Sequence, residues 1–293
     1  MTAHRRRPLL RWHGGKWKIA KWIIEHFPSH DAYVEPYGGG ASVLLQKEPV
    51  RAELYNDLDD TLIRLFRVLQ DPEKAERLVW LLERTPFARR EFQRAYEPAD
   101  GDDVEAARRT LARSFMGIGA LGTTGRAKTG FRRAITGNKF CAREWSSYPA
   151  ALRLTIDRLR DVSIECCDAG ELIASVDAPG TLFYLDPPYL PETRSSKSRR
   201  GGEQYHTYHY ELSPEQHVTL LEQLNSISGM AVLSGYPSAL YDEHLVGWQR
   251  VERDAYAHGG LDRTEVLWIN PAAQARMAQD RAIGAQAALF EGR

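Results

Sequence analysis

Cysteine is scarce in this sequence, and the few that occur form no pattern that binds metal or builds disulfides. The 293 residues include three cysteines, Cys141, Cys166 and Cys167, of which two are adjacent. An odd number with two neighbours matches neither a disulfide framework nor the ligand spacing of a zinc site. We therefore expect reduced cysteines and no required metal.

Long apolar runs are also missing. No uncharged apolar stretch approaches the roughly 18 residues that a membrane helix needs. Arg5, Arg6 and Arg7 stand near the start, but no apolar segment typical of a signal peptide follows them. With 43% hydrophobic and 27% charged residues, the composition is ordinary for a globular protein. These absences predict a cytoplasmic protein that does not enter a membrane.

An excess of charge of one sign is absent too, because 39 basic residues balance 39 acidic ones. The chain as a whole therefore does not attract a polyanion. Two local stretches are nevertheless basic and contain no acid, and each fits either a solvated loop or a surface that binds a polyanion. The first contains Arg126, Lys128, Arg132, Arg133, Lys139 and Arg143, and the second contains Arg194, Lys197, Arg199 and Arg200.

The pattern of apolar residues predicts alternating strands and helices. Such alternation is typical of an α/β fold with a Rossmann-like, mostly parallel sheet and helices on both faces. Ligands of such sheets bind beyond the carboxyl ends of the strands. We expect strands at residues 32–34, 51–55, 162–166, 181–185, 230–233 and 264–269, and helices at residues 41–46, 58–69, 152–159, 170–176 and 214–227.

The stretch at residues 71–145 departs from this alternation. It is first helical and rich in Arg and Glu, and six glycines then interrupt a basic segment between Gly117 and Gly137. We interpret residues 71–145 as a smaller insert of helices and loops within a main domain of residues 1–70 and 146–271. Residues 272–293 form an Ala- and Gln-rich tail, either helical or frayed.

The turn after residues 32–34 combines an acid with three glycines. Gly38, Gly39 and Gly40 allow a ligand to approach the backbone closely. The spacing is not the dinucleotide fingerprint, since residue 43 is valine, and there is no phosphate-binding Gly-Lys-Ser/Thr loop. Glu35 would repel a phosphate but suits a ligand that carries a cation, such as S-adenosylmethionine with its sulfonium and ammonium. A tight turn without a ligand is the alternative.

Asp57 and Asp168 also follow predicted strands. Asp57 stands about twenty residues after the glycine turn, where an acid can accept both ribose hydroxyls of a nucleoside. Asp168 could accept from an adenine amine. Either residue could instead cap the helix that follows it. The sequence leaves both interpretations open.

Asp186-Pro187-Pro188-Tyr189 is the strongest signal, because two consecutive prolines stiffen the turn after an apolar strand. The turn presents the Asp186 carboxylate, the Pro187 carbonyl and the Tyr189 ring. Two acceptors and a ring suit an aromatic amine, whose positive charge they would stabilise as its nitrogen attacks a methyl group. Because a base amine inside a duplex is inaccessible, the base would first have to flip out.

These motifs together resemble the Dam-type DNA adenine methyltransferases, including phage and prophage members. The similar segments are Arg11–Lys16, Val34–Val43, Asp186–Tyr189 and the closing Arg263–Asn270. They occur in the family's order, and the resemblance runs from about residue 9 to 271. It implies a monomeric enzyme of DNA methylation, whether or not part of a restriction-modification system, that uses S-adenosylmethionine and acts on double-stranded DNA.

The resemblance also implies roles for individual residues, with residues 71–145 as the target-recognition insert. Three positions depart from common family residues: His13, Tyr37 and Ala169, the last of which weakens the role of Asp168. The implied cofactor-binding residues are Trp12, Lys16, Glu35, Pro36, Tyr37, Gly38, Gly40, Asp57, Asp168 and Asp186; the catalytic residues are Asp186, Pro187, Pro188 and Tyr189; and the DNA-binding residues are Arg126, Lys128, Arg132, Arg133, Lys197 and Arg199.

Other functions fit the same chemistry. Methyltransferases acting on cytosine amines or protein amides resemble this pattern with Ser or Asn at position 186, so Asp186 favours adenine. An RNA adenine methyltransferase is harder to exclude, although the basic middle segment favours duplex DNA. A DNA-binding relative without activity is the non-enzymatic alternative, and the intact Glu35, Asp186 and Tyr189 argue against it.

Overall fold

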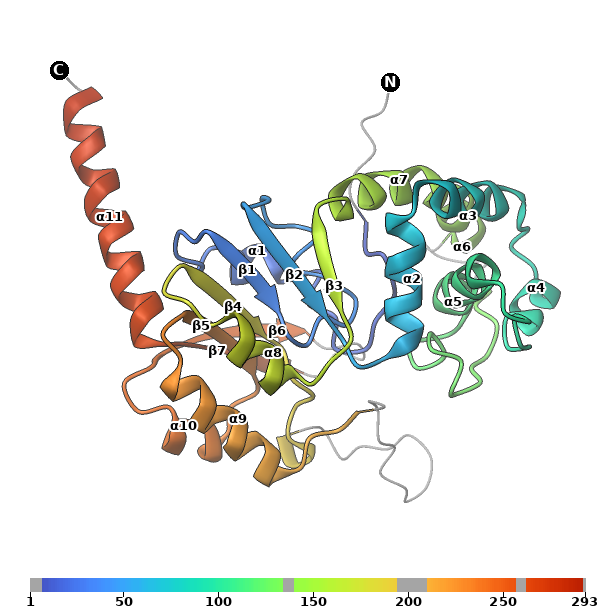
Figure 1. Ribbon diagram of the computed structural model, residues 1–293. Helices are drawn as coiled ribbons and strands as arrows, with labels where there is room; N and C mark the ends of the chain where they lie inside the picture. The colour runs from blue at the N-terminus through green and yellow to red at the C-terminus, as the bar shows by residue number, and fades with distance from the viewer. Residues whose placement is uncertain (1–6, 134–139, 194–209, 257–261, 292–293) are drawn as a thin grey trace. The chain divides into compact units, whose positions relative to one another are not determined.

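The structure is a computed structural model that describes residues 7–133, 140–193, 210–256 and 262–291 (Figure 1). The chain divides into two units, each made of segments far apart in the sequence. The first unit comprises Met1–Ala20, Gly38–Lys47 and Asp57–Cys166, and the second comprises Lys21–Tyr37, Glu48–Asn56 and Cys167–Arg293.

Six strands of the sheet belong to the second unit, in the order β2-β1-β4-β5-β7-β6. The neighbours β2-β1, β1-β4 and β4-β5 pair in parallel, whereas β7 pairs antiparallel with both β5 and β6. This arrangement confirms the Rossmann-like α/β fold. The strands are β1 (Ala32–Glu35), β2 (Ala52–Asn56), β4 (Thr181–Leu185), β5 (Met230–Gly235), β6 (Gln249–Tyr256) and β7 (Asp262–Ile269).

Both faces of these strands are covered. Side chains alternate between the two faces, and every residue of β4 and β5 is buried. On one face, Phe183 and Leu233 pack in a buried core with residues of α8 (Ala169–Val176), α9 (Pro214–Ser226) and α10 (Ala239–His244). On the other face, the rings of Tyr33 and Tyr184 each lie within 6 Å of the ring of Phe27, just after α1 (Ala20–Ile24). The core is thus built from residues that alternate along β1, β4 and β5.

The first unit is mainly helical. Its helix α5 is buried along nearly its whole length and packs against α2, α3 and α4. Aspartates begin three of the helices, since the side chains of Asp59, Asp71 and Asp102 accept backbone N–H groups of the first turn. The elements are α2 (Asp60–Gln70), α3 (Pro72–Arg84), α4 (Arg89–Arg94), α5 (Asp103–Met116), α6 (Cys141–Ser146), α7 (Tyr148–Leu159) and the strand β3 (Val162–Glu165).

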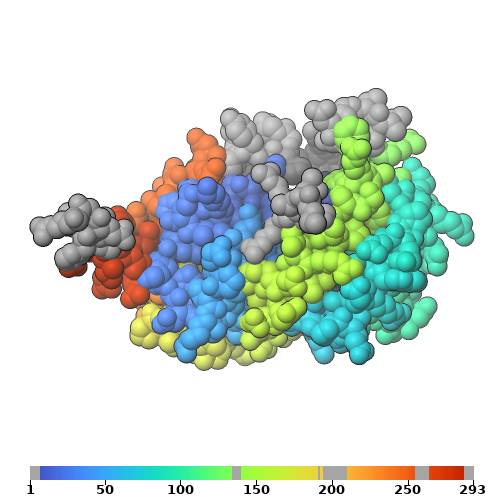
Figure 2. All heavy atoms as spheres, turned by 90° about the horizontal axis from the view of Figure 1, so that it is seen from above, coloured from blue at the N-terminus to red at the C-terminus, as the bar shows by residue number. Residues whose placement is uncertain are grey.

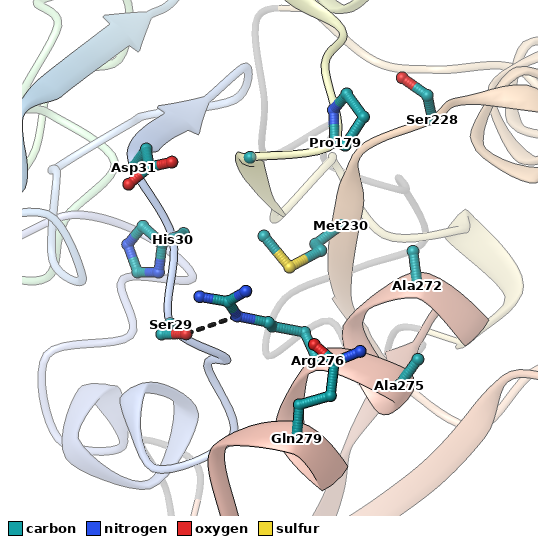
Figure 3. Close-up of a pocket in the computed structure, with 11 residues that line it drawn as sticks. Ser29, His30, Asp31, Pro179, Ser228, Met230, Ala272, Ala275, Arg276 and Gln279 are labelled. Carbon is teal, nitrogen blue, oxygen red and sulfur yellow. Dashed lines mark hydrogen bonds between the residues drawn. The ribbon is translucent and has the colours of Figure 1, made fainter. Parts of the chain in front are cut away.

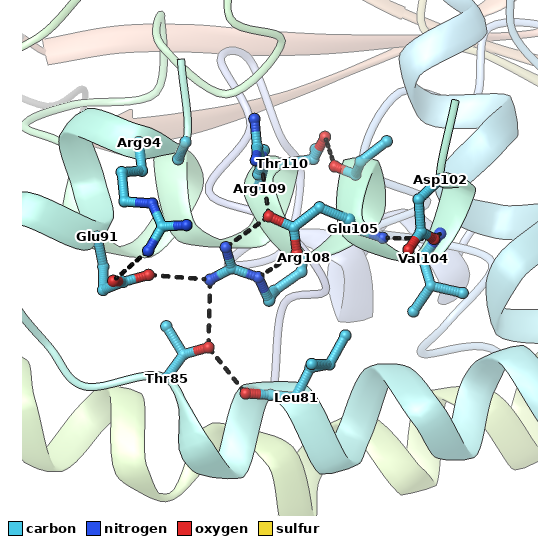
Figure 4. Close-up of polar contacts among 12 residues, drawn as sticks. Leu81, Thr85, Glu91, Arg94, Asp102, Val104, Glu105, Arg108, Arg109 and Thr110 are labelled. Atoms are coloured by element: carbon cyan, nitrogen blue, oxygen red, sulfur yellow. Dashed lines mark hydrogen bonds and ion pairs between the residues drawn. The ribbon is translucent and has the colours of Figure 1, made fainter. Parts of the chain in front are cut away.

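Arginines of α5 are buried rather than displayed to solvent (Figure 4). Arg108 and Arg109 both donate to the Glu105 carboxylate at 2.6 Å. Arg113 donates to the carbonyls of Ala95 and Thr123. These charge-assisted bonds hold the surrounding loops, so these three arginines of α5 have a structural role.

Two expectations about secondary structure need correction. Residues 41–46 form turns instead of the expected helix, and Ala41 at their start has a φ of +49°, in the left-handed region that excludes it from a right-handed helix. Strand β6 was not expected, since its sequence is polar and strongly charged.

The tail is helical, as α11 (Pro271–Glu291), and extends away from the strands of its unit (Figures 1 and 2). Among the described residues, no helix is both long and apolar enough to cross a membrane.

The side chain of Asn270 joins β7, β5 and α11. Its Oδ1 accepts from the backbone N–H groups of Ala231 and Ala273 at 3.0 and 2.9 Å, and its Nδ2 donates to the carbonyl of Gly229 at 2.9 Å. Asn270 is only 3% exposed, so water cannot replace these bonds.

We expect Asn270→Ala to lower the free energy of unfolding by about 2–4 kcal/mol, because each buried backbone group left unpaired costs about 1–3 kcal/mol. Urea denaturation measures this. Asn225→Ala is the control, since Asn225 also makes two side-chain bonds but is exposed. Equal losses of unfolding free energy in the two variants would contradict the structural role of Asn270.

Candidate active site

The Asp186-Pro187-Pro188-Tyr189 turn follows β4, every residue of which is buried. The parallel register of β4 and β5 pairs Tyr184 with Val232, so two residues further Asp186 lies across from Ser234. The Ser234 hydroxyl donates to Asp186 Oδ1 at 3.3 Å and is itself 3.0 Å from the Tyr184 hydroxyl. Asp186 remains partly exposed. Ser234 therefore orients its carboxylate, while solvent or a ligand can still reach it.

Tyr189 is held at both its ring and its hydroxyl. The hydroxyl donates to Glu265 Oε2 at 3.0 Å, and the ring lies 4.5 Å from the ring of Tyr236 at 77°. Burial raises the pKa of Tyr189 well above its ordinary value, and the negative charges of Asp186 and Glu265 add to the effect. Tyr189 therefore stays protonated and is a hydrogen-bond donor.

Glu35 ends β1 and is 2% exposed. Its Oε1 accepts the hydroxyl of Tyr33 at 2.7 Å. Burial, followed by the charge of Glu35, raises the pKa of Tyr33. A buried carboxylate at the carboxyl end of a parallel strand is chemically suited to accept from a cationic group.

Asn56, which the sequence analysis overlooked, connects two of the predicted turns. Its Nδ2 donates to the carbonyls of Pro36 and Cys167, and its Oδ1 accepts the backbone N–H of Cys167. The turn after β1 and the turn before α8 are thereby tied to the end of β2. An amide side chain at a strand end was the available signal.

Asp168 is the N-cap of α8. Its Oδ1 accepts the backbone N–H groups of Gly170 and Glu171 at 2.8 and 3.1 Å. Its charge also acts on Tyr37, whose pKa is raised by burial and then by Asp168. The capping interpretation of Asp168 is therefore confirmed, and both capping bonds end on the same carboxylate oxygen.

The first unit brings together Trp12, the glycine turn and Asp57. Gly39 has a φ of +50°, and a Cβ added there would lie 2.6 Å from Trp12 Nε1, so the indole covers the turn closely. A Cβ on Gly40 would lie 3.0 Å from Trp12 Cβ. Asp57 Oδ2 accepts the backbone N–H of Gly39 at 2.8 Å. At position 39, only glycine adopts the positive φ and lies against the Trp12 ring without strain.

Lys16 belongs to the same unit and is 6% exposed, with its Nζ 2.9 Å from the carbonyl of Gly14. Asp57 is not the helix cap that the sequence allowed, because Asp59 caps α2 by accepting the N–H of Thr61. Burial instead raises the pKa of Asp57 to about 6, against the opposing effect of backbone hydrogen bonds.

The basic residues expected to contact DNA differ in their surroundings. Lys128 and Arg133 are exposed, and Arg126 is exposed with its Nη2 3.8 Å from Asp59. Arg132 is partly buried and pairs with Glu144. Lys197 and Arg199 lie outside the described residues.

A separate pocket lies at the opposite, amino ends of the strands (Figure 3). It is lined by Ser29 and Asp31 before β1, by Gly180 before β4, and by Arg276 of α11, which donates to Ser29 Oγ. None of the predicted site residues lines it. Within the described part of the chain, no group of three or more His, Cys, Asp or Glu could hold a metal ion.

The sequence model of the D12 class of N6 adenine-specific DNA methyltransferases matches residues 12–247. The chain belongs to this class. It is therefore a DNA adenine methyltransferase, and the resemblance to Dam-type enzymes is confirmed.

Individual proteins agree with this. The chain is 24% identical over 272 residues to a DNA adenine methylase of Salmonella typhi, a match covering 87% of this chain and 91% of the relative. It is 26% identical over 218 residues to the type II methyltransferase M.MjaIII of Methanocaldococcus jannaschii, a match covering 65% of this chain and 71% of the relative. A solved rRNA methylase from Streptococcus thermophilus aligns at a TM-score of 0.34 and 11% identity, a match covering 92% of this chain and 99% of that chain.

The raised pKa of Asp57 predicts a pH-dependent stability. Because the folded state holds this proton more tightly than the unfolded chain, the group's contribution is fully present below about pH 4. It is lost as pH rises through about 6. We expect the stability of the wild type relative to Asp57→Asn to fall between pH 4 and 6, measured by urea denaturation across this range. A difference in unfolding free energy between the two proteins that does not change with pH would contradict the raised pKa of Asp57.

Proposed function

We propose that this methyltransferase uses S-adenosylmethionine to methylate N6 of an adenine flipped out of duplex DNA, with Asp186-Pro187-Pro188-Tyr189 as its catalytic turn. The observation that supports this most is the anchoring of Asp186: a half-buried carboxylate aligned by Ser234 at the end of a wholly buried strand. We also propose that the enzyme acts as a monomer in the cytoplasm.

The chemistry follows from the weak nucleophilicity of an aromatic amine, whose lone pair is delocalised into the ring. The Asp186 carboxylate and the Pro187 carbonyl would accept the two amine hydrogens and stabilise positive charge as it develops on the nitrogen. Fixed acceptors cost little reorganisation during the reaction. Since Tyr189 is 7% exposed, a base would contact only part of its ring.

The residues expected to hold S-adenosylmethionine fit its chemistry. When bound, it supplies an electrophilic methyl group on a sulfonium. The buried carboxylate of Glu35 would attract its cationic end, and the Lys16 ammonium suits its carboxylate. Asp57 would accept ribose hydroxyls, as the acid after a second strand commonly does. The remaining proposed contacts come from Trp12, Pro36, Tyr37, Gly38, Gly40, Asp168 and Asp186.

DNA contact is proposed for the insert at residues 71–145 within a catalytic domain of residues 1–70 and 146–271. Lys128 and Arg133 are exposed and can pair with phosphates, which gives salt-dependent affinity. Arg132 pairs with Glu144 and would have to exchange this partner for a phosphate.

Replacing Asp186 by Ala tests the catalytic assignment. We expect kcat to fall at least about 100-fold, because removal of a preorganised group that stabilises transition-state charge has an effect of this size. DNA binding, measured by fluorescence anisotropy, should stay within about twofold because phosphate contacts dominate affinity. The control is Asp157→Ala, an exposed aspartate of α7. Unchanged turnover in Asp186→Ala would refute the proposed mechanism.

The proposed DNA surface predicts a change in salt dependence. Lys128→Ala and Arg133→Ala should each reduce the slope of log affinity against log salt by about 0.9 in magnitude, since each would remove one phosphate contact. Titrations of duplex DNA at several salt concentrations measure the slope. Arg160→Ala, at an exposed arginine 73% accessible on its side chain, is the control. A slope equal to that of the wild type would contradict the assignment.

A further inference from the structure

Glu265 lies on β7, outside every motif to which a role has been given. The antiparallel register pairs Gly235 with Val266, so the next residues outward, Tyr236 and Glu265, lie across from each other. Both contact Tyr189, one through its ring and the other through its carboxylate. The antiparallel part of the sheet therefore reaches the last residue of the Asp186–Tyr189 turn.

The hydrogen bond between Tyr189 and Glu265 has a defined direction. An ionised carboxylate only accepts, so the phenol proton of Tyr189 points to Glu265 Oε2, 3.0 Å away. A bond to a charged acceptor is stronger than one between neutral groups. Because the hydroxyl lies on the long axis of the ring, this bond fixes the direction of that axis, while the edge-to-face contact with Tyr236 limits rotation of the ring plane about it.

We propose that Glu265 is a positioning residue for methyl transfer, which accepts the Tyr189 hydroxyl and so fixes the direction of the ring against which the target adenine lies. This inference rests on the proposed role of Tyr189. Two anchors of the turn then come from neighbouring strands: Ser234 of β5 orients Asp186, and Glu265 of β7 orients Tyr189.

The direction of the ring matters because the base amine must meet the Asp186 carboxylate and the Pro187 carbonyl together. Two prolines stiffen the backbone between Asp186 and Tyr189, so rotation of Tyr189 about its Cα–Cβ bond is the main remaining freedom that the Glu265 bond removes. Small losses of alignment at a reacting centre reduce rates considerably. Glu265 would therefore affect turnover without touching the substrate.

A double-mutant cycle tests this. Glu265→Ala and Tyr189→Phe should each lower kcat about tenfold, and the double variant should also lose about tenfold rather than about 100-fold, because both changes remove the same bond. Glu265→Gln keeps an acceptor oxygen and should stay within about twofold of the wild type. Glu252→Ala on β6, an exposed glutamate paired with Arg250, is the matched control and should leave kcat unchanged.

A spectroscopic readout separates positioning from general destabilisation. An oligonucleotide duplex carries 2-aminopurine in place of the adenine that the wild-type enzyme methylates, identified by sequencing methylated plasmid. We expect bound Glu265→Ala and Tyr189→Phe to show brighter 2-aminopurine than the wild type, since a poorly stacked base is less quenched, while Glu265→Gln matches the wild type. Identical fluorescence in all four proteins would overturn the proposal.

The outcomes also distinguish this inference from the function on which it rests. If Asp186→Ala is inactive but Glu265→Ala and Tyr189→Phe reduce kcat additively, the positioning role of Glu265 is wrong and the catalytic turn stands. If Asp186→Ala turns over normally, the proposed catalytic turn itself fails, whatever the cycle shows.

Discussion

The parallel pairing of β1 with β2 and with β4 is the constraint on which the candidate site depends. Parallel strands end at the same edge of a sheet, so Glu35, Asn56 and Asp186 are brought to one edge by backbone hydrogen bonds alone. Side chains then refine the arrangement. Asn56 ties the turn after β1 to the turn before α8, and Ser234 aligns Asp186. The polar groups at this edge are therefore held in place by the backbone pairing of β1, β2 and β4.

A group of buried and partly buried carboxylates is the second feature that shapes the site. Glu35, Asp186 and Glu265 all affect the pKa of Tyr184, although burial is the largest cause of its rise. Burying carboxylates is unfavourable unless they are hydrogen-bonded, and here tyrosine and serine hydroxyls donate to them. Such a set of acceptors suits a positively charged methyl donor and an amine that becomes positive as it reacts.

Local sequence was sufficient for the fold class and for the turn at Asp186–Tyr189, because apolar strands and consecutive prolines are local signals. It was wrong about residues 41–46, which form turns that begin at the left-handed Ala41. It missed β6, whose charged sequence becomes a strand by pairing along its length with β7.

Roles that arise from contacts distant in the sequence could not be predicted. Asn56 and Cys167 are 111 residues apart, and Tyr189 and Glu265 are 76 residues apart. Nothing in the neighbouring residues reports such pairs. The same reason explains Asp57, which the sequence allowed as a helix cap but whose carboxylate accepts from Gly39 instead.

The most direct test of the account is to incubate the protein with S-adenosylmethionine labelled in its methyl group and unmethylated plasmid DNA, digest the DNA and separate the nucleosides. We predict that the label appears in N6-methyladenine, and that Asp186→Ala abolishes it. Label in methylcytosine, or in added RNA but not in DNA, would contradict the account.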